Sequence, residues 1–333
     1  MIISYRRNFH QKTFGRALKN TVALSSHFIC RSFGTKYTNK TRLDKILGSY
    51  APYGRLARLD KPMGIPLLLA PTWWGAAIAT DPNTFFDLKV FGILLTGTVA
   101  SRTAGCVIND IWDKDFDKQV ERTKHRPLAS GELSLIQAFK LLGGSLSLSL
   151  LSMLSLNTEC WKIGVAALPL MAIYPLSKRF TWWPQLVQGL AMNFGVFMGY
   201  AAVHGSVEFG KVLPLYSAGI CWTMVYDTIY GHQDKKYDEK LGLKSTSLLF
   251  GERTKPILYC FSVASIGSLV LAGIKSDLTL PFYLSASVAS LQLFWQINKA
   301  QLNDPENLYQ IFSSNKWFGG IVLLGIVSGK NFL

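Results

Sequence analysis

Residues 88–131 read LKVFGILLTGTVASRTAGCVINDIWDKDFDKQVERTKHRPLASG, where an apolar run passes directly into a densely charged block. The apolar part is close to the roughly 20 residues that cross a bilayer as a helix. Asp110, Asp113 and Asp117 follow it at spacings of three and four, so on a helix they share one face. Three carboxylates on one face repel one another unless a cation lies among them. That cation is either a hard divalent metal such as Mg2+ or neighbouring Arg and Lys side chains.

The remainder of the chain repeats the apolar pattern. The apolar runs lie at residues 62–80, 88–108, 135–156, 161–176, 184–204, 211–229, 255–274, 279–297 and 317–328. With 49% hydrophobic and 17% charged residues, the chain is too apolar for an ordinary soluble protein. Buried helices of a large soluble protein are the alternative, but little sequence of soluble character separates the runs. The sequence therefore predicts an all-α, polytopic membrane protein, a bundle of about nine transmembrane helices.

The positive charge is distributed as in a membrane protein. The net charge of +15 could indicate nucleic-acid binding, but nine Lys and Arg residues precede the first acidic residue, Asp44. Most of the others flank apolar runs, which is how charge orients membrane helices rather than how a groove binds phosphates. The expected partner is the lipid bilayer, and no nucleic acid is expected.

Residues 1–43 have the composition of a mitochondrial transit peptide. They are rich in Arg, Lys, Ser and Thr, contain no Asp or Glu, and interleave basic with apolar residues. A secretory signal would instead need an unbroken apolar core and a small-residue cleavage site. We expect processing near Arg31, with a disordered basic tail as the alternative. The membrane domain is then expected at 44–333.

A second acidic block, YDTIYGHQDKKYDEKLGLKST, runs from Tyr226 to Thr246 and also follows an apolar run. It places Asp234 and Asp238 four residues apart, and therefore on one helix face. Counted from one side of the membrane, the even-numbered runs all end on that side, which puts both acidic blocks on the same face. The loops of the opposite face, near 81–87, 157–160, 205–210 and 275–278, are short and carry few Lys or Arg residues. This charge bias agrees with the count.

Five motifs in order resemble the UbiA superfamily of intramembrane aromatic prenyltransferases, over essentially everything after residue 55. They are NDxxDxxxD at Asn109–Asp117, RTxxRPLASG at Arg122–Gly131, YPxxKR at Tyr174–Arg179, PQxxxG at Pro184–Gly189, and YDTxYxxQDxxxD with GxKSTxxxFG from Tyr226 to Gly251. The first string alone is a weak signal, but the ordered set is specific.

The resemblance implies a bundle of nine transmembrane helices around a central cavity, with both Asp-rich motifs at its mouth. It also implies a Mg2+-dependent reaction in ubiquinone biosynthesis. In that reaction a polyprenyl group passes from polyprenyl diphosphate to the ring carbon of 4-hydroxybenzoate ortho to the hydroxyl, and diphosphate is released. With the transit-like N-terminus, the expected location is the mitochondrial inner membrane, with the Asp-rich loops on the matrix side. The resemblance also allows association with other enzymes of ubiquinone biosynthesis.

Under this resemblance the polar residues of the motifs receive roles around a metal-bound diphosphate. Metal binding is assigned to Asn109, Asp110, Asp113, Asp117, Asp234 and Asp238. Cations for the phosphates are expected from Arg102, Arg126, Lys178 and Lys244, each with an anchor for lipid phosphate as its alternative.

The acceptor needs groups of its own. Arg58 or Arg179 is expected to bind the benzoate carboxylate; Arg58 and Lys61, at the entrance of the first span, are otherwise interfacial anchors. Asp227, just inside the sixth span, is expected to orient metal-bound water or accept the phenol proton. Tyr174 and Tyr230 either line the cavity or simply pack.

Other functions remain open from the sequence. Within the family, the acceptor could be a different aromatic compound, and the length of the polyprenyl tail is not encoded in any motif. Outside it, a multispan transporter or a membrane scaffold would explain the hydropathy. Neither predicts two acidic clusters on one face, and a transporter would place its ionisable residues near mid-span.

Overall fold

The computed structural model describes residues 42–61, 63–82, 84, 87–118, 123–240 and 242–331. It divides into two compact units, Met1–Ala51 and Pro52–Leu333. The described part of the first unit contains α2 (Arg42–Leu47) and the short 3-10 helix η1 (Gly48–Tyr50). The predicted transit peptide, 1–43, lies outside the described residues except for the first two residues of α2.

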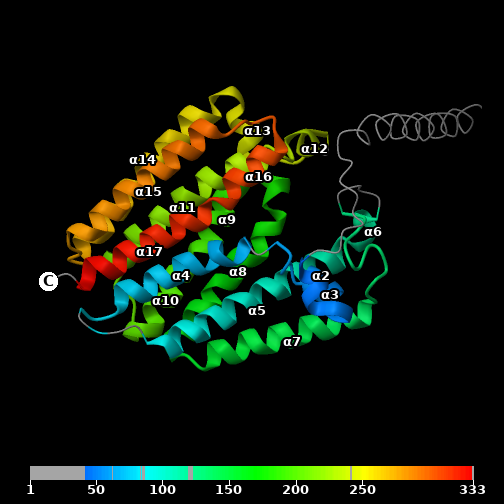
Figure 1. The fold of residues 1–333 in the computed structure, drawn as a ribbon, viewed down its shortest axis with the longest axis horizontal. Coiled ribbons are helices and arrows are strands. Elements are labelled where there is room, and N and C mark those ends of the chain that lie inside the picture. Colours follow the sequence, from blue (N-terminus) through cyan, green and yellow to red (C-terminus); the bar gives the residue numbers. More distant parts are fainter. Residues whose placement is uncertain are drawn as a thin grey trace, which may run out of the picture. The chain divides into compact units, whose positions relative to one another are not determined.

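Every regular element of the described residues is a helix, which confirms the all-α prediction (Figure 1). After α3 (Ala51–Leu56) come α4 (Gly64–Ala79), α5 (Leu88–Trp112), α6 (Lys114–Asp117), α7 (Leu135–Leu154), α8 (Thr158–Phe180), α9 (Pro184–Asn193), α10 (Gly195–His204), α11 (Phe209–Gly231), α12 (Lys235–Lys240), α13 (Thr246–Phe250), η2 (Gly251–Arg253), α14 (Thr254–Lys275), α15 (Leu280–Lys299), α16 (Pro305–Ser313) and α17 (Asn315–Asn331).

Each of the nine apolar runs falls on helical structure. Within the described residues, six helical segments are long and apolar enough to cross a bilayer: Leu88–Trp112, Leu135–Leu154, Thr158–Phe180, Pro184–His204, Thr246–Lys275 and Pro305–Lys330. Helix α4 is apolar but shorter, and α11 (Phe209–Gly231) and α15 (Leu280–Lys299) are not among these six segments. The polytopic architecture is therefore confirmed, while a count of nine spans stays a prediction.

An aromatic cluster inside the second unit joins α4, α11 and α17. Trp74, Trp222 and Phe318 are buried, with ring centroids 5.4, 4.9 and 6.2 Å apart. The indole N–H of Trp74 donates to the carbonyl of Gly319 at 2.9 Å, and that of Trp222 donates to Asn315 Oδ1 at 2.8 Å. Because large rings supply contact area and both indole donors are paired, the cluster holds these helices in register.

The loops predicted to share one face of the membrane lie at one end of the second unit. The backbone N–H of Lys244 donates to the carbonyl of Lys178 at 2.8 Å, joining the loop after α11 to the end of α8. The Gln233 side chain donates to the carbonyl of Pro305 at 2.9 Å, joining the same loop to the start of α16. This end therefore gathers the segments that carry the motifs.

The opposite end is closed by different contacts. The Thr279 N–H, before α15, donates to the carbonyl of Gly329 in α17 at 2.9 Å. The ammonium of Lys330 donates to the carbonyls of Ile78 and Thr80, at the C-terminal end of α4. Both contacts tie the last helix to its neighbours away from the acidic blocks.

Helices α4 and α10 pack backbone against backbone. A Cβ atom at Gly199 would overlap the carbonyl oxygen of Thr72, and one at Gly75 would overlap that of Val196. Glycine at these positions lets the two helices approach more closely than any side chain would permit, a common mode of association for membrane helices.

We therefore expect Gly199→Ala to lower the stability of the protein, by about 1–3 kcal/mol, because the added methyl group must push the helices apart. The measurement is the thermal unfolding midpoint of the purified chain in detergent micelles. Gly267→Ala is the matched control, since an added Cβ there meets no atom within 4 Å. Equal midpoints for the two variants would contradict close packing at Gly199.

Candidate active site

The first acidic block lies where α5 ends. Helix α5 stops at Trp112 and α6 begins at Lys114, so the helix is interrupted rather than continuous. The turns nevertheless follow one another, because the Asp113 N–H donates to the carbonyl of Asn109 at 2.9 Å and the Asp117 N–H donates to that of Asp113 at 2.8 Å. The backbone therefore keeps steps of about one turn through this block, but Asp113 is exposed whereas Asp110 and Asp117 are buried, so the three side chains do not share one environment.

Two arginines hold the buried carboxylates of this block. Asp110 is 0% exposed and Asp117 is 4% exposed. Arg58 donates to Asp110 Oδ1 at 2.6 Å, while Arg126 donates to the same oxygen at 3.2 Å and to Asp117 Oδ2 at 2.8 Å. Arginine side chains therefore supply positive charge to both buried carboxylates, and metal binding by this block stays a prediction.

Arg58 reaches Asp110 from the turn that ends α3. Its φ of 58° is in the left-handed region, which residues other than glycine rarely adopt. The N–H of the next residue, Leu59, donates to the carbonyl of Gly54 at 2.9 Å, the bond that typically closes a helix with a left-handed residue. The chain therefore changes direction at Arg58, and the ion pair with Asp110 compensates for an unfavourable backbone conformation.

The donor set of the first block fits a hard divalent ion. Oδ2 of Asp110 is buried and accepts no hydrogen bond from the residues that the structure describes, an arrangement that is costly for a carboxylate oxygen. Among the described residues, no three His, Cys, Asp or Glu side chains come close enough together to hold a metal by themselves. Mg2+ needs no such cluster, because it takes one or two carboxylates and completes its shell with phosphate oxygens and water.

The second acidic block follows α11. The Asp238 N–H donates to the carbonyl of Asp234 at 2.8 Å, so the two residues lie one helical turn apart, as predicted. Asp238 is buried, and Lys178 at the end of α8 lies 3.1 and 3.0 Å from its two carboxylate oxygens. The second block is thus paired with a lysine, as the first is paired with arginines.

Both blocks contain carboxyl groups that resist ionisation. Partial burial, and then the Asp117 carboxylate, raises the pKa of Asp113, against the lowering effect of Arg126 and Arg179. Burial likewise raises the pKa of Asp238, and Lys178 and its hydrogen bond oppose that rise. Since Lys178 and Arg179 are consecutive, the end of α8 carries one cation toward each block.

A hydrogen-bonded chain of three side chains lies farther along α8, α9 and α11 from the acidic end, with Tyr174 exposed. Asp227 of α11 is half-buried and hydrogen-bonds with Gln188 of α9. The Gln188 side-chain oxygen in turn accepts from the hydroxyl of Tyr174 in α8 at 2.6 Å. The sequence motifs do not single out Gln188, although it stands at a variable position of PQxxxG, directly before Gly189.

Two of the predicted substrate-binding residues, Arg102 and Lys61, meet at the loop before α4, and their substrate roles stay predictions. Arg102 donates to the carbonyls of Lys61 at 3.2 Å and Ala57 at 3.5 Å, and so supports this loop. Its guanidinium occupies the space that a Cβ at Gly64 would fill. Lys61 is exposed and contributes its carbonyl to this contact.

The remaining candidates lie around the acidic end. The Lys244 ammonium donates to the carbonyl of Phe180 at 3.3 Å and lies 5.8 Å from the ring centroid of Trp182. Tyr230 stacks on Phe312 with ring centroids 4.4 Å apart, which favours packing as its role. The Asn109 side chain is exposed beside the first block. The ligand roles of these residues stay predictions.

The sequence is similar to a known family of membrane enzymes. The UbiA prenyltransferase family matches residues 68–319. Mitochondrial 4-hydroxybenzoate polyprenyltransferase of Bos taurus is 48% identical over 279 residues, which cover 84% of this chain and 75% of the bovine protein. The Arabidopsis thaliana protein of the same name is 48% identical over 280 residues, covering 84% and 69%.

Solved structures confirm the predicted fold. The apo structure of a UbiA homolog from Aeropyrum pernix K1 matches with a TM-score of 0.67 at 25% identity, covering 79% of this chain and 96% of that one. A UbiA homolog from Archaeoglobus fulgidus bound to GPP and Mg2+ matches with a TM-score of 0.60 at 22% identity, covering 84% and 98%.

The ion pairs predict a specific cost for removing Arg58. We expect Arg58→Ala to lower the free energy of unfolding by about 3 kcal/mol, because it removes a close partner of a buried carboxylate. Arg55→Ala, whose partner Glu132 is exposed, should cost less than about 1 kcal/mol. Denaturation in detergent micelles without added metal measures both.

A double-mutant cycle separates the pair from general damage. When Asp110→Asn is already present, Arg58→Ala should cost much less, since the buried charge has been removed. An equal cost with and without Asp110→Asn would mean that Arg58 stabilises the protein in another way.

Proposed function

Because the chain belongs to the UbiA prenyltransferase family, we propose that it transfers a polyprenyl group from polyprenyl diphosphate to 4-hydroxybenzoate in ubiquinone biosynthesis. The new bond forms at the ring carbon ortho to the hydroxyl, and diphosphate leaves. The choice of 4-hydroxybenzoate as the acceptor rests on one observation. The chain is 48% identical, over most of both chains, to a protein named for this reaction. The gathering of two acidic blocks and their cations at one end supports diphosphate chemistry.

The proposed leaving-group site uses the two acidic blocks together. Asp110, Asp113 and Asp117, with Asn109, would bind Mg2+ on one side of the diphosphate, and Asp234 and Asp238 would bind Mg2+ on the other, with one or two carboxylates per ion. When bound, Mg2+ supplies electrostatic stabilisation of the departing diphosphate. The Archaeoglobus fulgidus homolog, whose solved structure is bound to GPP and Mg2+, supports this cofactor.

Basic residues of the site would share the remaining phosphate charge. Arg58, Arg126 and Lys178 already neutralise the carboxylates at distances of 2.6 to 3.2 Å. Each therefore lies beside the positions where phosphate oxygens would bind. Arg102 and Lys244 are assigned instead to holding the loops around the site, because their donors contact backbone carbonyls.

The acceptor would bind deeper than the diphosphate, near Asp227. As the allylic C–O bond breaks, its electron pair leaves with the diphosphate and the ortho carbon attacks the allylic cation. Asp227 would accept the phenol proton, with Gln188 and Tyr174 orienting its carboxylate. After the attack, the ortho C–H bond would break, which restores the aromatic ring, and its proton would pass to the released diphosphate or to water. Asp227 would then return its proton to the phenol oxygen. The apolar helices around Asp227 would keep water from the cation.

We place the protein in the mitochondrial inner membrane with the acidic blocks on the matrix side, and residues 1–43 as its transit peptide. The names of the relatives and the basic, acid-free composition of 1–43 support this placement. Association with other enzymes of ubiquinone biosynthesis is part of the proposal. A different aromatic acceptor is the alternative within the family; the multispan transporter has no support from the relatives.

The metal-binding roles predict that Asp113→Ala and Asp234→Ala lower product formation about 100-fold or more, because each removes charge that stabilises the leaving group. The assay measures prenylated 4-hydroxybenzoate and diphosphate released by membranes that contain the chain, polyprenyl diphosphate and Mg2+. Chelation should abolish release, and added Mg2+ should restore it.

Asp115→Ala is the matched control for these variants. Asp115 lies in the same block, is 88% exposed at its side chain, and pairs with Lys118. Its loss should leave the rate near that of the unaltered chain. Unchanged release with Asp113→Ala or Asp234→Ala would refute the proposed leaving-group site.

The acceptor carboxylate can be assigned by kinetics. Arg58 is already engaged by Asp110, whereas Arg179 is exposed beside the first block. We therefore expect Arg179→Gln to raise the KM for 4-hydroxybenzoate about tenfold or more and to leave the KM for polyprenyl diphosphate unchanged. If Arg58→Gln alone shows this pattern, the carboxylate ligand is Arg58 instead.

A further inference from the structure

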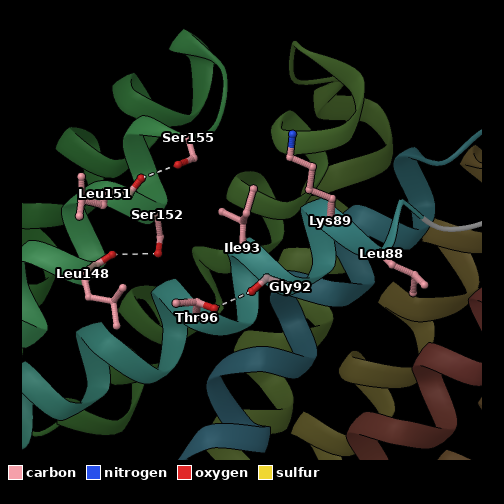
Figure 2. Close-up of a pocket in the computed structure, with 9 residues that line it drawn as sticks. All are labelled: Leu88, Lys89, Gly92, Ile93, Thr96, Leu148, Leu151, Ser152 and Ser155. Atoms are coloured by element: carbon pink, nitrogen blue, oxygen red, sulfur yellow. Dashed lines mark hydrogen bonds between the residues drawn. The ribbon is translucent and has the colours of Figure 1, made fainter.

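A groove of about 420 Å3 lies between α5 and α7, away from the residues of the proposed reaction (Figure 2). It is lined by the first turns of α5, from Leu88 to Thr96, and by the last turns of α7, from Leu148 to Ser155. Both helices are long and apolar enough to span a membrane. Since Asp110 is at the other end of α5, the groove opens toward the membrane face opposite the acidic blocks.

The groove ends where α5 and α7 come into contact. There, a Cβ added at Gly97 would lie 3.3 Å from Cβ of Ser152. Gly92, five residues earlier on α5, also lines the groove, and a Cβ added there would meet no atom within 4 Å. Space beside Gly92 is therefore open to a ligand.

The walls of the groove suit hydrocarbon. Its three hydroxyl groups each donate to a carbonyl of their own helix: Thr96 to Gly92 at 2.9 Å, Ser152 to Leu148 at 2.8 Å, and Ser155 to Leu151 at 2.7 Å. Figure 2 shows these bonds following each helix. A sugar or another polar ligand would have to break them, whereas an alkyl chain needs only the apolar side chains between them.

One positive charge stands at the open end. Lys89, in the first turn of α5, is exposed, and Figure 2 shows its amino group at the same end of the groove as Ser155. A cation at the membrane surface above an apolar groove complements an amphipathic anion, whose head group meets the lysine and whose chain enters the groove.

We propose that the groove between α5 and α7 is a binding site for an anionic phospholipid, with an acyl chain between the helices and the phosphate on Lys89. A polyprenyl diphosphate matches the groove less well, since its charged end would have to lie at the acidic blocks and not at Lys89. The proposal is independent of the catalytic assignment.

Native mass spectrometry of the full chain, released from micelles with phosphatidylglycerol or phosphatidylcholine, tests the site. The unaltered chain should retain phosphatidylglycerol about fivefold more tightly. Lys89→Gln should abolish this preference. Gly92→Leu, which places a side chain in open space, should weaken retention of both lipids while leaving the thermal midpoint unchanged.

Lys275→Gln is the matched control, because Lys275 is an exposed lysine at the end of α14 on the same face as Lys89. It should retain the preference in full. The proposal is overturned if the unaltered chain binds both lipids equally, or if Lys275→Gln loses as much preference as Lys89→Gln. Displacement of the bound lipid by geranyl diphosphate would overturn it in favour of a prenyl-chain site.

Discussion

The buried carboxylate of Asp110, held by Arg58 and Arg126, is the interaction on which the acidic end of this protein depends. A charge at the end of an apolar helix is tolerable only when it is paired, because its desolvation costs several kcal/mol. The pairing joins the turn before α4, the end of α5 and the loop before α7. One buried charge therefore determines where three separate segments lie. Its second oxygen, Oδ2, has no hydrogen-bond partner among the described residues.

The second block is positioned by packing as much as by charge. Asp227 lies on α11 and Asp234 just beyond its end, and the aromatic cluster of Trp74, Trp222 and Phe318 holds this helix against α4 and α17. The end of α8 then supplies Lys178 to Asp238, while the neighbouring arginine acts on the first block. Because consecutive residues address both blocks, a movement of α8 would change both at once. In the proposed function both blocks bind one diphosphate, so this coupling would keep the two halves of the site together.

The two ends of the second unit are built for different chemistry. The end with the motifs concentrates ion pairs and carboxyl groups that are difficult to ionise. The other end is held by backbone carbonyls around Lys330 and by the contact of Thr279 with Gly329, and it contains the groove beside Lys89. The charged residues of the two ends therefore have different partners: carboxylates at the end with the motifs, and backbone carbonyls around Lys330 at the other.

The sequence by itself determined the helices, the side on which their loops gather, and the one-turn spacing of Asp234 and Asp238, because hydropathy and helical periodicity are local properties. It also indicated that positive charge must lie among Asp110, Asp113 and Asp117, and left open whether a metal ion or basic side chains supply it. Only the tertiary structure decided that Arg58, 52 residues away, reaches Asp110, that Arg102 turns to backbone carbonyls, and that Gln188 joins Tyr174 to Asp227. Those choices depend on which side chains meet when separate helices pack, and no spacing along the chain encodes that.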